Sequence, residues 1–485
     1  MNSAAKTKKK LKNRLKSNII KGTLILSCAS ILSRIIGFIY RIYLADILGE
    51  QLLGTYQLIF PIYVLCFTIY GAGMQSAISQ VVATLMGKNN THPQDSNFKD
   101  NTSKYSSSSI AVSKNNNNSS LVKGNYPFVS SSARNITPRT ILLAGTILSF
   151  ILALFLSIFI NFNSKWIACN ILMVPDCDIY LKLLTYLFPF CSISACICGY
   201  QYGLENAKPP AIAGIIEQIT RILFVFIVQG FFSDKEICCQ IAVYGLTVGE
   251  FFGFLYNMST IKNKTFNKRK NKISLKESFK LLLPVFISLT SIKLTISLLH
   301  SVESIFIPAS LVKYGYTMNE ALSVYGIYSG MAMPFIMFPA TITMAISTML
   351  LPAVSKAHSS GNKKQIKKLI RRTSYFCLVT GMAATVFFLL FGNICASLFF
   401  HNELAGRYLT VMSFLCPFLY LNMTYSSILN GLGKPHMTFV ITVVCTLIKI
   451  LSLIFFVPKY GMIAYIAASL VAEALLCVML RHYCG

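Results

Sequence analysis

Long apolar segments alternate with short polar segments along almost the whole chain. Many apolar runs reach about 20 residues, which is the length that an α-helix needs to cross the hydrocarbon core of a bilayer. Helices are expected because a backbone that faces lipid must satisfy its own hydrogen bonds. We predict twelve membrane-spanning helices, at residues 20–44, 56–86, 139–161, 180–203, 211–232, 238–260, 279–309, 320–350, 373–400, 407–430, 436–457 and 462–482.

The composition agrees with this pattern. Of the 485 residues, 54% are hydrophobic and only 12% are charged, and the mean hydropathy is +0.60. A water-soluble domain needs more polar surface than this. The chain is therefore predicted to be an all-α, multi-pass protein of the cell membrane.

The net charge of +28 is concentrated in short segments that flank the apolar helices. This distribution is typical of cytoplasmic loops, which also attract anionic lipid headgroups. We therefore expect both termini to be cytoplasmic. Without an aromatic-basic motif, the charge does not indicate nucleic-acid binding. The basic segments are "KTKKKLKNRLK" (Lys6–Lys16), "KNKTFNKRKNKISLK" (Lys262–Lys276) and "KKQIKKLIRR" (Lys363–Arg372).

One polar segment is much longer than a simple connection. Residues 87–139 are rich in Asn and Ser and cannot bury enough apolar area to offset the entropy of ordering, so we expect a disordered cytoplasmic loop. The predicted organisation is a basic cytoplasmic tail (1–19), an N-terminal six-helix lobe (20–260) that contains this loop, a basic linker (261–278) and a C-terminal six-helix lobe (279–485).

The two halves of the chain resemble each other. "GEQLLGTYQLIFPIY" (Gly49–Tyr63) has a counterpart in "NEALSVYGIYSGMAMPF" (Asn319–Phe335), and the loop Tyr202–Ala211 has one in Leu429–Met437. With six helices each, the halves have the same orientation in the membrane. We expect an axis along the membrane normal to relate them, with a central cavity between the lobes.

Two arginines lie inside the first predicted helix. Arg34 is 13 residues beyond Lys21, or about 20 Å into the helix, and Arg41 follows seven residues later on nearly the same face. A charge at this depth is costly unless it faces a water-filled cavity or an ion-pair partner. Arg34 therefore lines the cavity or forms a structural ion pair. Arg41 lines the cavity or extends to the outer interface.

The seventh predicted helix carries a second polar face. Lys293 and His300 are seven residues apart, and Glu303 lies one turn beyond His300. These side chains are predicted to line the cavity opposite the helix-1 arginines, with a histidine that can titrate near neutral pH. In the alternative interpretation, Glu303 simply neutralises Lys293 or Arg34 in the core.

A third candidate lies on the fifth predicted helix, where Glu217 and Arg221 have the i,i+4 spacing of an intrahelical ion pair. Pairing with each other is one role, and contact with substrate is the other. Guanidinium groups in a cavity favour an anionic cargo such as a phosphate or pyrophosphate.

Motifs for covalent chemistry are missing from the sequence. There is no G-x-x-x-x-G-K-[ST] loop and no catalytic triad, and the 15 cysteines lie mostly in apolar segments without a pair of C-x-x-C motifs. We expect no enzyme activity, no cofactor and no metal site. Translocation without covalent change is the predicted chemistry, carried out by a monomer.

Four segments together resemble the stage V sporulation protein B family, within the multidrug/oligosaccharidyl-lipid/polysaccharide exporter superfamily. They are Lys21–Tyr63, Gly199–Phe224, Leu282–Leu311 and Gly431–Ile450. The resemblance covers nearly the whole chain except the Asn/Ser-rich loop. It implies two six-helix lobes around a central cavity, alternating access, and export of a polyprenyl-pyrophosphate-linked saccharide, a peptidoglycan precursor for the spore cortex.

The lipid II flippases of this superfamily begin with a similar R-x-x-G-F pattern, which here is Arg34 to Phe38. Their second helix-1 arginine follows six residues after the first, where this chain has Tyr40 instead, with Arg41 one position later. The resemblance therefore supports Arg34 more strongly than Arg41 as a cargo ligand.

Two other functions fit the same sequence. One is a cation-coupled multidrug or metabolite antiporter on the same fold. The other is a scaffold that transports nothing and recruits the cell-wall synthesis enzymes that build the cortex.

Overall fold

The computed structural model describes residues 31–89, 136–261 and 275–484, and these residues are almost entirely helical. Residues 31–58 are helical. The remaining helices are α2 (Phe60–Phe67), η1 (Thr68–Ala72), α3 (Gly73–Asn89), α4 (Pro138–Trp166), η3 (Ile167–Leu172), α5 (Cys177–Thr185), α6 (Phe188–Gly203), α7 (Lys208–Gln229), α8 (Lys235–Thr260), α9 (Leu275–Tyr314), α10 (Met318–Gly326), η4 (Ile327–Ala332), α11 (Met333–Ser359), α12 (Lys363–Phe400), α13 (Glu403–Met412), η5 (Ser413–Leu415), α14 (Cys416–Gly431), α15 (Pro435–Phe455), α16 (Val457–Tyr460) and α17 (Met462–Cys484).

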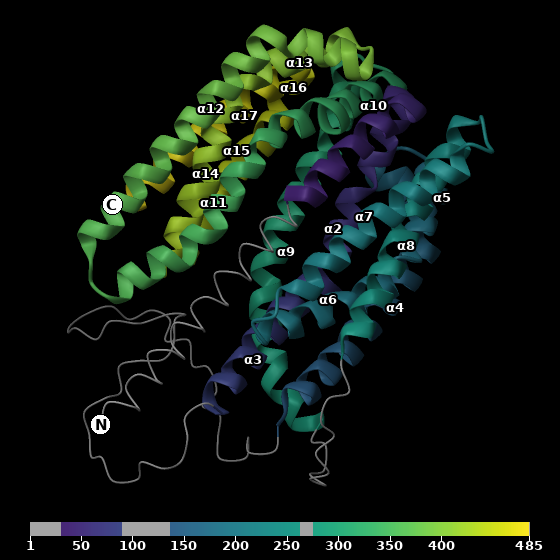
Figure 1. Cartoon of the computed structure of the whole chain (residues 1–485). Coiled ribbons are helices and arrows are strands. Elements are labelled where there is room, and N and C mark those ends of the chain that lie inside the picture. Colours follow the sequence, from purple (N-terminus) through teal and green to yellow (C-terminus); the bar gives the residue numbers. More distant parts are fainter. Residues whose placement is uncertain (1–30, 90–135, 262–274, 485) are drawn as a thin grey trace, which may run out of the picture.

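Ten helices of the described residues are long and apolar enough to span a membrane, or eleven if the bent pair α5–α6 counts as one span. The first of these, Ile31–Met86, has 56 residues, whereas about 20 suffice for one crossing. Its chain turns at Gly49, whose φ of +71° is readily available only to glycine. Figure 1 shows this segment running to one end of the molecule and returning through α2 to α3. The described residues thus contain ten or eleven such helices, compared with the twelve predicted from the sequence.

The helices form two bundles (Figure 1). In the N-terminal bundle α7 packs on α8, and α6 packs on α3 and α4. In the C-terminal bundle α14 packs on α11 and α12, and α15 packs on α17. The predicted all-helical, two-lobe fold is confirmed.

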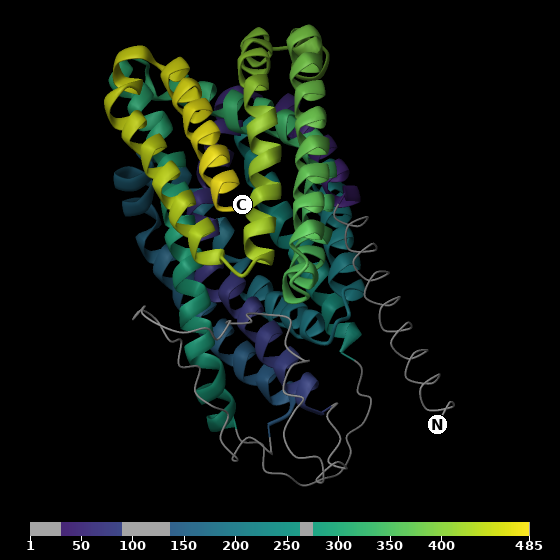
Figure 2. The ribbon, with the colours of Figure 1, turned by 90° about the vertical axis from the view of Figure 1, so that its left-hand side faces the viewer.

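Helix α9 packs against both bundles. It contacts α2, α3 and α4 of the N-terminal bundle and α10, α15 and α16 of the C-terminal bundle. Its 40 residues give it a length of about 60 Å, and it extends past the C-terminal bundle in Figures 1 and 2. The helix predicted at residues 279–309 belongs to the predicted C-terminal lobe, but the first half of α9 lies along the N-terminal bundle.

Helix termini follow local sequence signals. Thr137 caps α4 through a capping box, and Pro138 occupies the first turn, where its missing N–H costs nothing. Asn362 caps α12 by accepting from the N–H of Gln365, so this helix begins at Lys363. The basic segment Lys363–Arg372, which was predicted to be a loop, is therefore the first part of a helix.

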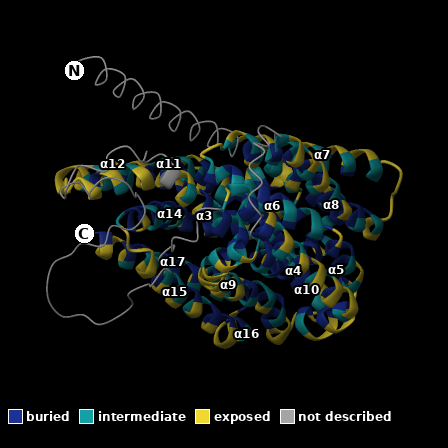
Figure 3. Ribbon diagram, turned by 90° about the horizontal axis from the view of Figure 1, so that it is seen from below, coloured by how far each residue is buried: buried dark blue, intermediate teal, exposed yellow. Residues whose placement is uncertain are grey.

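The surface of the bundles is apolar. Helix α12 exposes Leu390, Ile394 and Leu398 by 60–67%, and α7 exposes Phe226 by 62%. Figure 3 shows that exposed positions follow the outer sides of these helices while buried positions face inward. An outward apolar surface of this kind is suited to lipid.

The two bundles meet closely at one end, where glycines face each other across the contact. A Cβ atom built on Gly54 would lie 2.0 Å from the Leu322 carbonyl oxygen, and one built on Gly326 would lie 2.2 Å from the Glu50 carbonyl oxygen. The contact is reciprocal, because each glycine meets the carbonyl four residues before the other. Such close helix approach requires small residues. The two glycines belong to Gly49–Tyr63 and Asn319–Phe335, the segments that resemble each other in sequence.

Several predicted segments lie outside the described residues. These are the basic tail 1–19, most of the Asn/Ser-rich loop and most of the basic linker. Within the predicted loop, α3 continues to Asn89, and α4 begins at Pro138.

Candidate functional site

The two helix-1 arginines lie on the helix face that also carries Phe38. Phe38 lies between them, four residues after Arg34 and three before Arg41, so the three side chains share one helix face. The Phe38 ring contacts Phe335 and Phe338 of α11, at centroid distances of 4.6 and 4.8 Å. This face of the N-terminal bundle is therefore turned toward the C-terminal bundle.

Neither arginine has an acidic partner among the described residues. Both side chains are exposed. The carboxylate of Glu50, nine residues beyond Arg41, accepts a hydrogen bond from Asn402 of the loop between α12 and α13. The structural ion pair considered for Arg34 is thus not formed within the described part of the chain.

The predicted pair on α7 is present: the guanidinium of Arg221 donates to Glu217 in a short ion pair. Glycines of α8 make room for it, because a Cβ atom at Gly249 would lie 3.1 Å from the Cβ of Arg221 and 2.7 Å from the Glu217 carbonyl oxygen. The Arg221 Nε is buried without a hydrogen-bond acceptor. Mutual pairing is therefore the role that the geometry shows, and substrate contact stays a prediction.

Lys293 does not join His300 and Glu303. Its ammonium group donates to the Ala72 carbonyl at 2.7 Å and to the Ser76 hydroxyl, both on the N-terminal bundle. Lys293 therefore fastens α9 to η1 and α3. The expectation that these three α9 side chains line one surface together is wrong.

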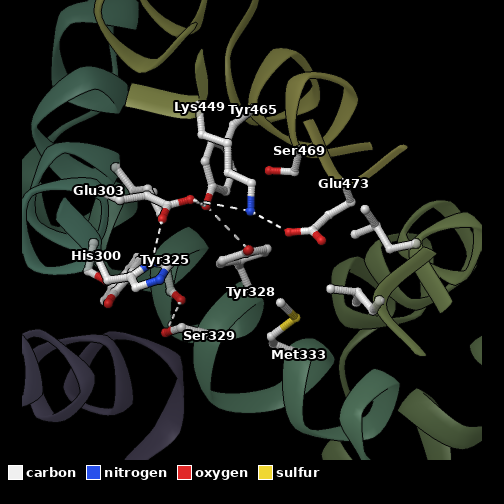
Figure 4. Close-up of a pocket in the computed structure, with 14 residues that line it drawn as sticks. His300, Glu303, Tyr325, Tyr328, Ser329, Met333, Lys449, Tyr465, Ser469 and Glu473 are labelled. Carbon is white, nitrogen blue, oxygen red and sulfur yellow. Dashed lines mark hydrogen bonds and ion pairs between the residues drawn. The ribbon is translucent and has the colours of Figure 1, made fainter. Parts of the chain in front are cut away.

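His300 and Glu303 instead open into a chamber of about 320 Å³ inside the C-terminal bundle (Figure 4). Its wall is formed by α9, α10, η4, α15 and α17, together with residues near the start of α14. Lys449 of α15 and Glu473 of α17 also line it. The four ionisable groups therefore come from three helices that are far apart in sequence.

The chamber groups form one connected network. The Lys449 ammonium lies 2.7 Å from Glu473 Oε1 and 4.0 Å from Glu303 Oε1. The other Glu303 oxygen is 3.1 Å from His300 Nδ1, and the Tyr465 hydroxyl donates to Glu303 Oε1 at 2.8 Å. Glu303 thus has a cation, but it is Lys449. The alternative in which Glu303 neutralises Lys293 or Arg34 is wrong.

The carboxylate of Glu473 is held on both sides, by Lys449 and by Asn422. Asn422 of α14 donates to Glu473 Oε2 at 2.8 Å, while the other oxygen of that carboxylate contacts Lys449. The side chains of Lys449, Glu303 and Glu473 are only 9–14% exposed, whereas that of His300 is 52% exposed. His300 is therefore the most exposed member of the network.

Sequence reasoning missed Lys449 and Glu473 as site residues. Both are charges inside apolar helices, which is a signal for function. Lys449 lies 146 residues and Glu473 lies 170 residues after Glu303 in the sequence. No helical spacing rule relates residues so far apart. Among the described residues, no group of three His, Cys, Asp or Glu side chains is placed to hold a metal ion.

Two family profiles match the chain. The profile described as "Polysaccharide biosynthesis protein" matches residues 19–113 and 127–358. The profile MatE matches residues 299–454.

Individual relatives are similar over most of their length. Stage V sporulation protein B of Bacillus subtilis (strain 168) is 24% identical over 478 residues, covering 96% of this chain and 83% of that protein. Lipid II flippase MurJ of the same organism is 22% identical, covering 90% and 77%.

Solved structures share the fold. An inward-facing multidrug resistance MATE family transporter of the MOP superfamily has a TM-score of 0.68 at 14% identity, covering 95% of this chain and 98% of that one. A MOP superfamily transporter from Pyrococcus furiosus, described as having a binding pocket of reverse polarity, has a TM-score of 0.61 at 16% identity, covering 96% of each chain.

Proposed function

Because this chain belongs to the polysaccharide biosynthesis protein family of membrane transporters, we propose that it is a flippase for a polyprenyl-pyrophosphate-linked saccharide. The cargo is a lipid II-type peptidoglycan precursor, and its use is synthesis of the spore cortex. The two relatives named above support this cargo, since one is a sporulation protein and the other a lipid II flippase.

The observation that carries the proposal is the unpaired charge at the contact between the bundles. Arg34 and Arg41 present two guanidinium groups on the face that meets α11, with no acidic partner among the described residues. A guanidinium is always charged and offers a planar fork of donors that fits phosphate oxygens. A pyrophosphate passing between the bundles supplies the negative charge that these positions lack.

Phe38 adds an apolar surface between the two arginines. The cargo is itself amphipathic, with an isoprenoid chain attached directly to the pyrophosphate. Arginine and phenylalanine on one helix face therefore match the junction of the cargo at which charge and hydrocarbon meet.

Alternating access follows from the two-bundle construction. The bundles contact each other where Gly54 meets Gly326, and Glu50 binds Asn402 in the same region. With both termini in the cytoplasm, this contact closes the outer end, and the cargo enters from the cytoplasmic leaflet. Opening the contact would then release the cargo outside. We propose that a monomer is sufficient for this cycle.

A cation-coupled antiporter is the second candidate. The MatE profile match at residues 299–454 and the paired carboxylates Glu303 and Glu473 favour it. It differs in its cargo, because a cationic drug would be repelled by Arg34 and Arg41.

Complementation tests the proposal. Bacillus subtilis cells that lack stage V sporulation protein B are transformed with this chain, with Arg34→Ala, or with Arg407→Ala as a control for an exposed arginine on α13. We expect cortex formation with the parent chain and with Arg407→Ala, and loss of cortex with Arg34→Ala at equal membrane abundance.

Other results would point elsewhere. If Arg34→Ala restores cortex fully, the guanidinium is not a cargo ligand. If no variant restores cortex but the parent chain exports ethidium, the antiporter is the correct function. If cells need the chain while Arg34→Ala is fully active and purified protein moves no lipid, a scaffold for cell-wall enzymes is supported.

A further inference from the structure

The first three turns of α12 carry a basic face that the described chain does not neutralise. Its six basic residues, all of them exposed, are Lys363, Lys364, Lys367, Lys368, Arg371 and Arg372. None of them forms an ion pair with another described residue. The sequence contains no Asp or Glu between Glu320 and Glu403, which lie in the first turns of α10 and α13. Anions that balance this charge must therefore come from outside the described residues.

The packing of α12 turns the basic face away from the protein. Leu369 and Ile370 lie between the basic residues in sequence and pack against the hydrophobic core. Asn362 caps the helix at its first turn, so the basic residues are held on a formed helix and not on a loop. Figure 1 shows α12 along the outer edge of the C-terminal bundle. The basic face is therefore accessible from outside this bundle.

The basic face continues directly into a lipid-facing surface. Lys368, Arg372, Tyr375, Val379 and Met382 recur every three or four residues and therefore share one side of α12. The last three are 70%, 49% and 50% exposed, as expected for side chains that contact lipid. A tyrosine is common at the boundary between hydrocarbon and headgroups. The change from basic to apolar at Tyr375 thus places Arg372 at the level of the headgroups.

Helix geometry limits which basic side chains reach the headgroups. The headgroup layer is about 6 Å deep on each side of the hydrocarbon core, which corresponds to about four residues of helix. Counted back from Tyr375, this layer contains Arg371 and Arg372, and the long side chain of Lys368 reaches it from one turn further away. Lys363 lies beyond this layer, in water.

The corresponding helix of the other bundle has no such face. The motif "AIS" occurs in α3 (Ala77–Ser79) and in α11 (Ala345–Ser347), so α4 and α12, which follow these helices, correspond to each other. The sequence at the start of α4, "PRTILLAGTI", contains one basic residue, Arg139. The repeated fold therefore does not require a basic cluster at this position, and the basic face is specific to α12.

The basic face lies on the same side of the membrane as the C-terminus. Four spans follow one another from Lys363 to Cys484, and an even number of crossings returns the chain to the side from which it started. This side is predicted to be cytoplasmic, and the cytoplasmic leaflet carries anionic phospholipids. Their phosphate oxygens fit the planar donor fork of arginine.

We propose that Lys368, Arg371 and Arg372 bind phosphate groups of anionic phospholipids in the cytoplasmic leaflet. Helix α12 packs on α11, α13 and α14, so a lipid bound here holds the C-terminal bundle at the level of that leaflet. An acidic soluble protein fits less well, because the same side of α12 is embedded in lipid from Tyr375 onward. The inference goes beyond the proposed flippase function and does not depend on its cargo.

A tryptophan reporter tests this site. The full-length chain is reconstituted in mixed bilayers of phosphatidylcholine and phosphatidylglycerol, in which one of the two lipids is brominated and quenches tryptophan fluorescence on contact. Trp166→Phe removes the only tryptophan in the sequence, and Tyr375→Trp then places one three residues after Arg372. We expect phosphatidylglycerol to be favoured at least about fivefold at position 375, which is the attraction contributed by one basic residue near an anionic surface. At Trp166 of the parent chain, we expect no preference.

Three further variants of this reporter chain separate the charge from other effects. Lys368→Gln/Arg371→Gln/Arg372→Gln should abolish the preference, because the three positive charges are lost. Lys368→Arg/Arg371→Lys/Arg372→Lys should keep it, because the charges remain. Lys313→Gln/Arg407→Gln removes two exposed charges from α9 and α13 and should change nothing. All of these side chains are exposed, so the substitutions leave the packing of the helices intact.

Other outcomes would overturn the proposal. Equal quenching by both lipids at position 375 would show that no anionic lipid binds there and would favour an acidic protein as the partner. A preference that survives in the triple glutamine variant would place the lipid site elsewhere. Displacement of phosphatidylglycerol by one molecule of polyprenyl pyrophosphate per protein would show that the basic face receives the cargo instead. Failed complementation by the parent chain would count against the flippase function alone and leave this lipid site standing.

Discussion

Lys449→Met provides the sharpest test of the buried charge network, because it removes the ammonium while keeping most of the side-chain volume. At 2.7 Å from Glu473 and an effective dielectric constant of about 20, the direct attraction is about 6 kcal/mol before desolvation is counted. Removing one partner of a buried pair costs about 3–5 kcal/mol, since the other charge is left uncompensated. We expect the variant to lose stability by this amount.

The hydrogen bonds that remain in Lys449→Met limit its loss of stability. Glu473 keeps the hydrogen bond from Asn422, and Glu303 keeps those from Tyr465 and His300. In the double variant Lys449→Met/Glu473→Gln the charges disappear as a unit, and the glutamine oxygen can still accept from Asn422. Because replacing both members of a buried pair is often close to neutral, we expect the double variant to recover at least about 2 kcal/mol.

The parent chain, Lys449→Met, Glu473→Gln and the double variant are compared by thermal unfolding in detergent. The signal is the amount of protein that stays monodisperse. Lys313→Met, at the exposed end of α9, controls for loss of a surface lysine. A coupling energy is obtained from the four midpoints. If the stability lost by the double variant equals the sum of the losses in Lys449→Met and in Glu473→Gln, the two residues are not coupled and the ion pair between them stabilises nothing.

Two further predictions address the contacts between the bundles. Gly54→Ala should loosen the helix contact at Gly326, since its Cβ would lie 2.0 Å from the Leu322 carbonyl oxygen. Disulfide cross-linking between Glu50→Cys and Asn402→Cys should then decrease. The control Gly214→Ala, whose Cβ has nothing within 4 Å, should leave the cross-linking unchanged. Lys293→Met should lower thermal stability by about 1–3 kcal/mol, because the Ala72 carbonyl loses a charged donor, and an unchanged melting temperature would show that this contact stabilises nothing.

The helices themselves were largely predictable, because the length of an apolar run reports directly on the thickness of the bilayer. Their ends were less so. Hydropathy detects the part of a helix that is embedded in lipid, whereas α12 begins ten residues earlier at Lys363, in a charged segment held by the Asn362 cap. Likewise, the tight corner at Gly49 joins two helices where a longer loop was expected.

The α9 face illustrates where pattern reasoning stops. Lys293 and His300 are seven residues apart, and the spacing predicted that they line one surface together. However, a 40-residue helix with Pro284 and Pro308 in its interior passes from one bundle to the other. Two residues on one side of it therefore have different neighbours, so Lys293 meets α3 and His300 meets the C-terminal chamber. Helix periodicity predicts the side of a helix on which a residue lies, but it does not predict which helix packs against that side.

The fate of each membrane-embedded charge separates structural groups from candidate cargo ligands. Glu217 and Arg221 satisfy each other within one bundle, and Lys449 is held between two carboxylates within the other. Arg34 and Arg41 differ, because they are exposed beside Phe38 where the bundles meet and have no acidic partner in the described ranges. A charge that the protein does not neutralise must be stabilised by water or by a ligand. Both arginines share the helix face of Phe38, which meets α11, and in the proposed cycle the missing anion would arrive there with the cargo and leave with it.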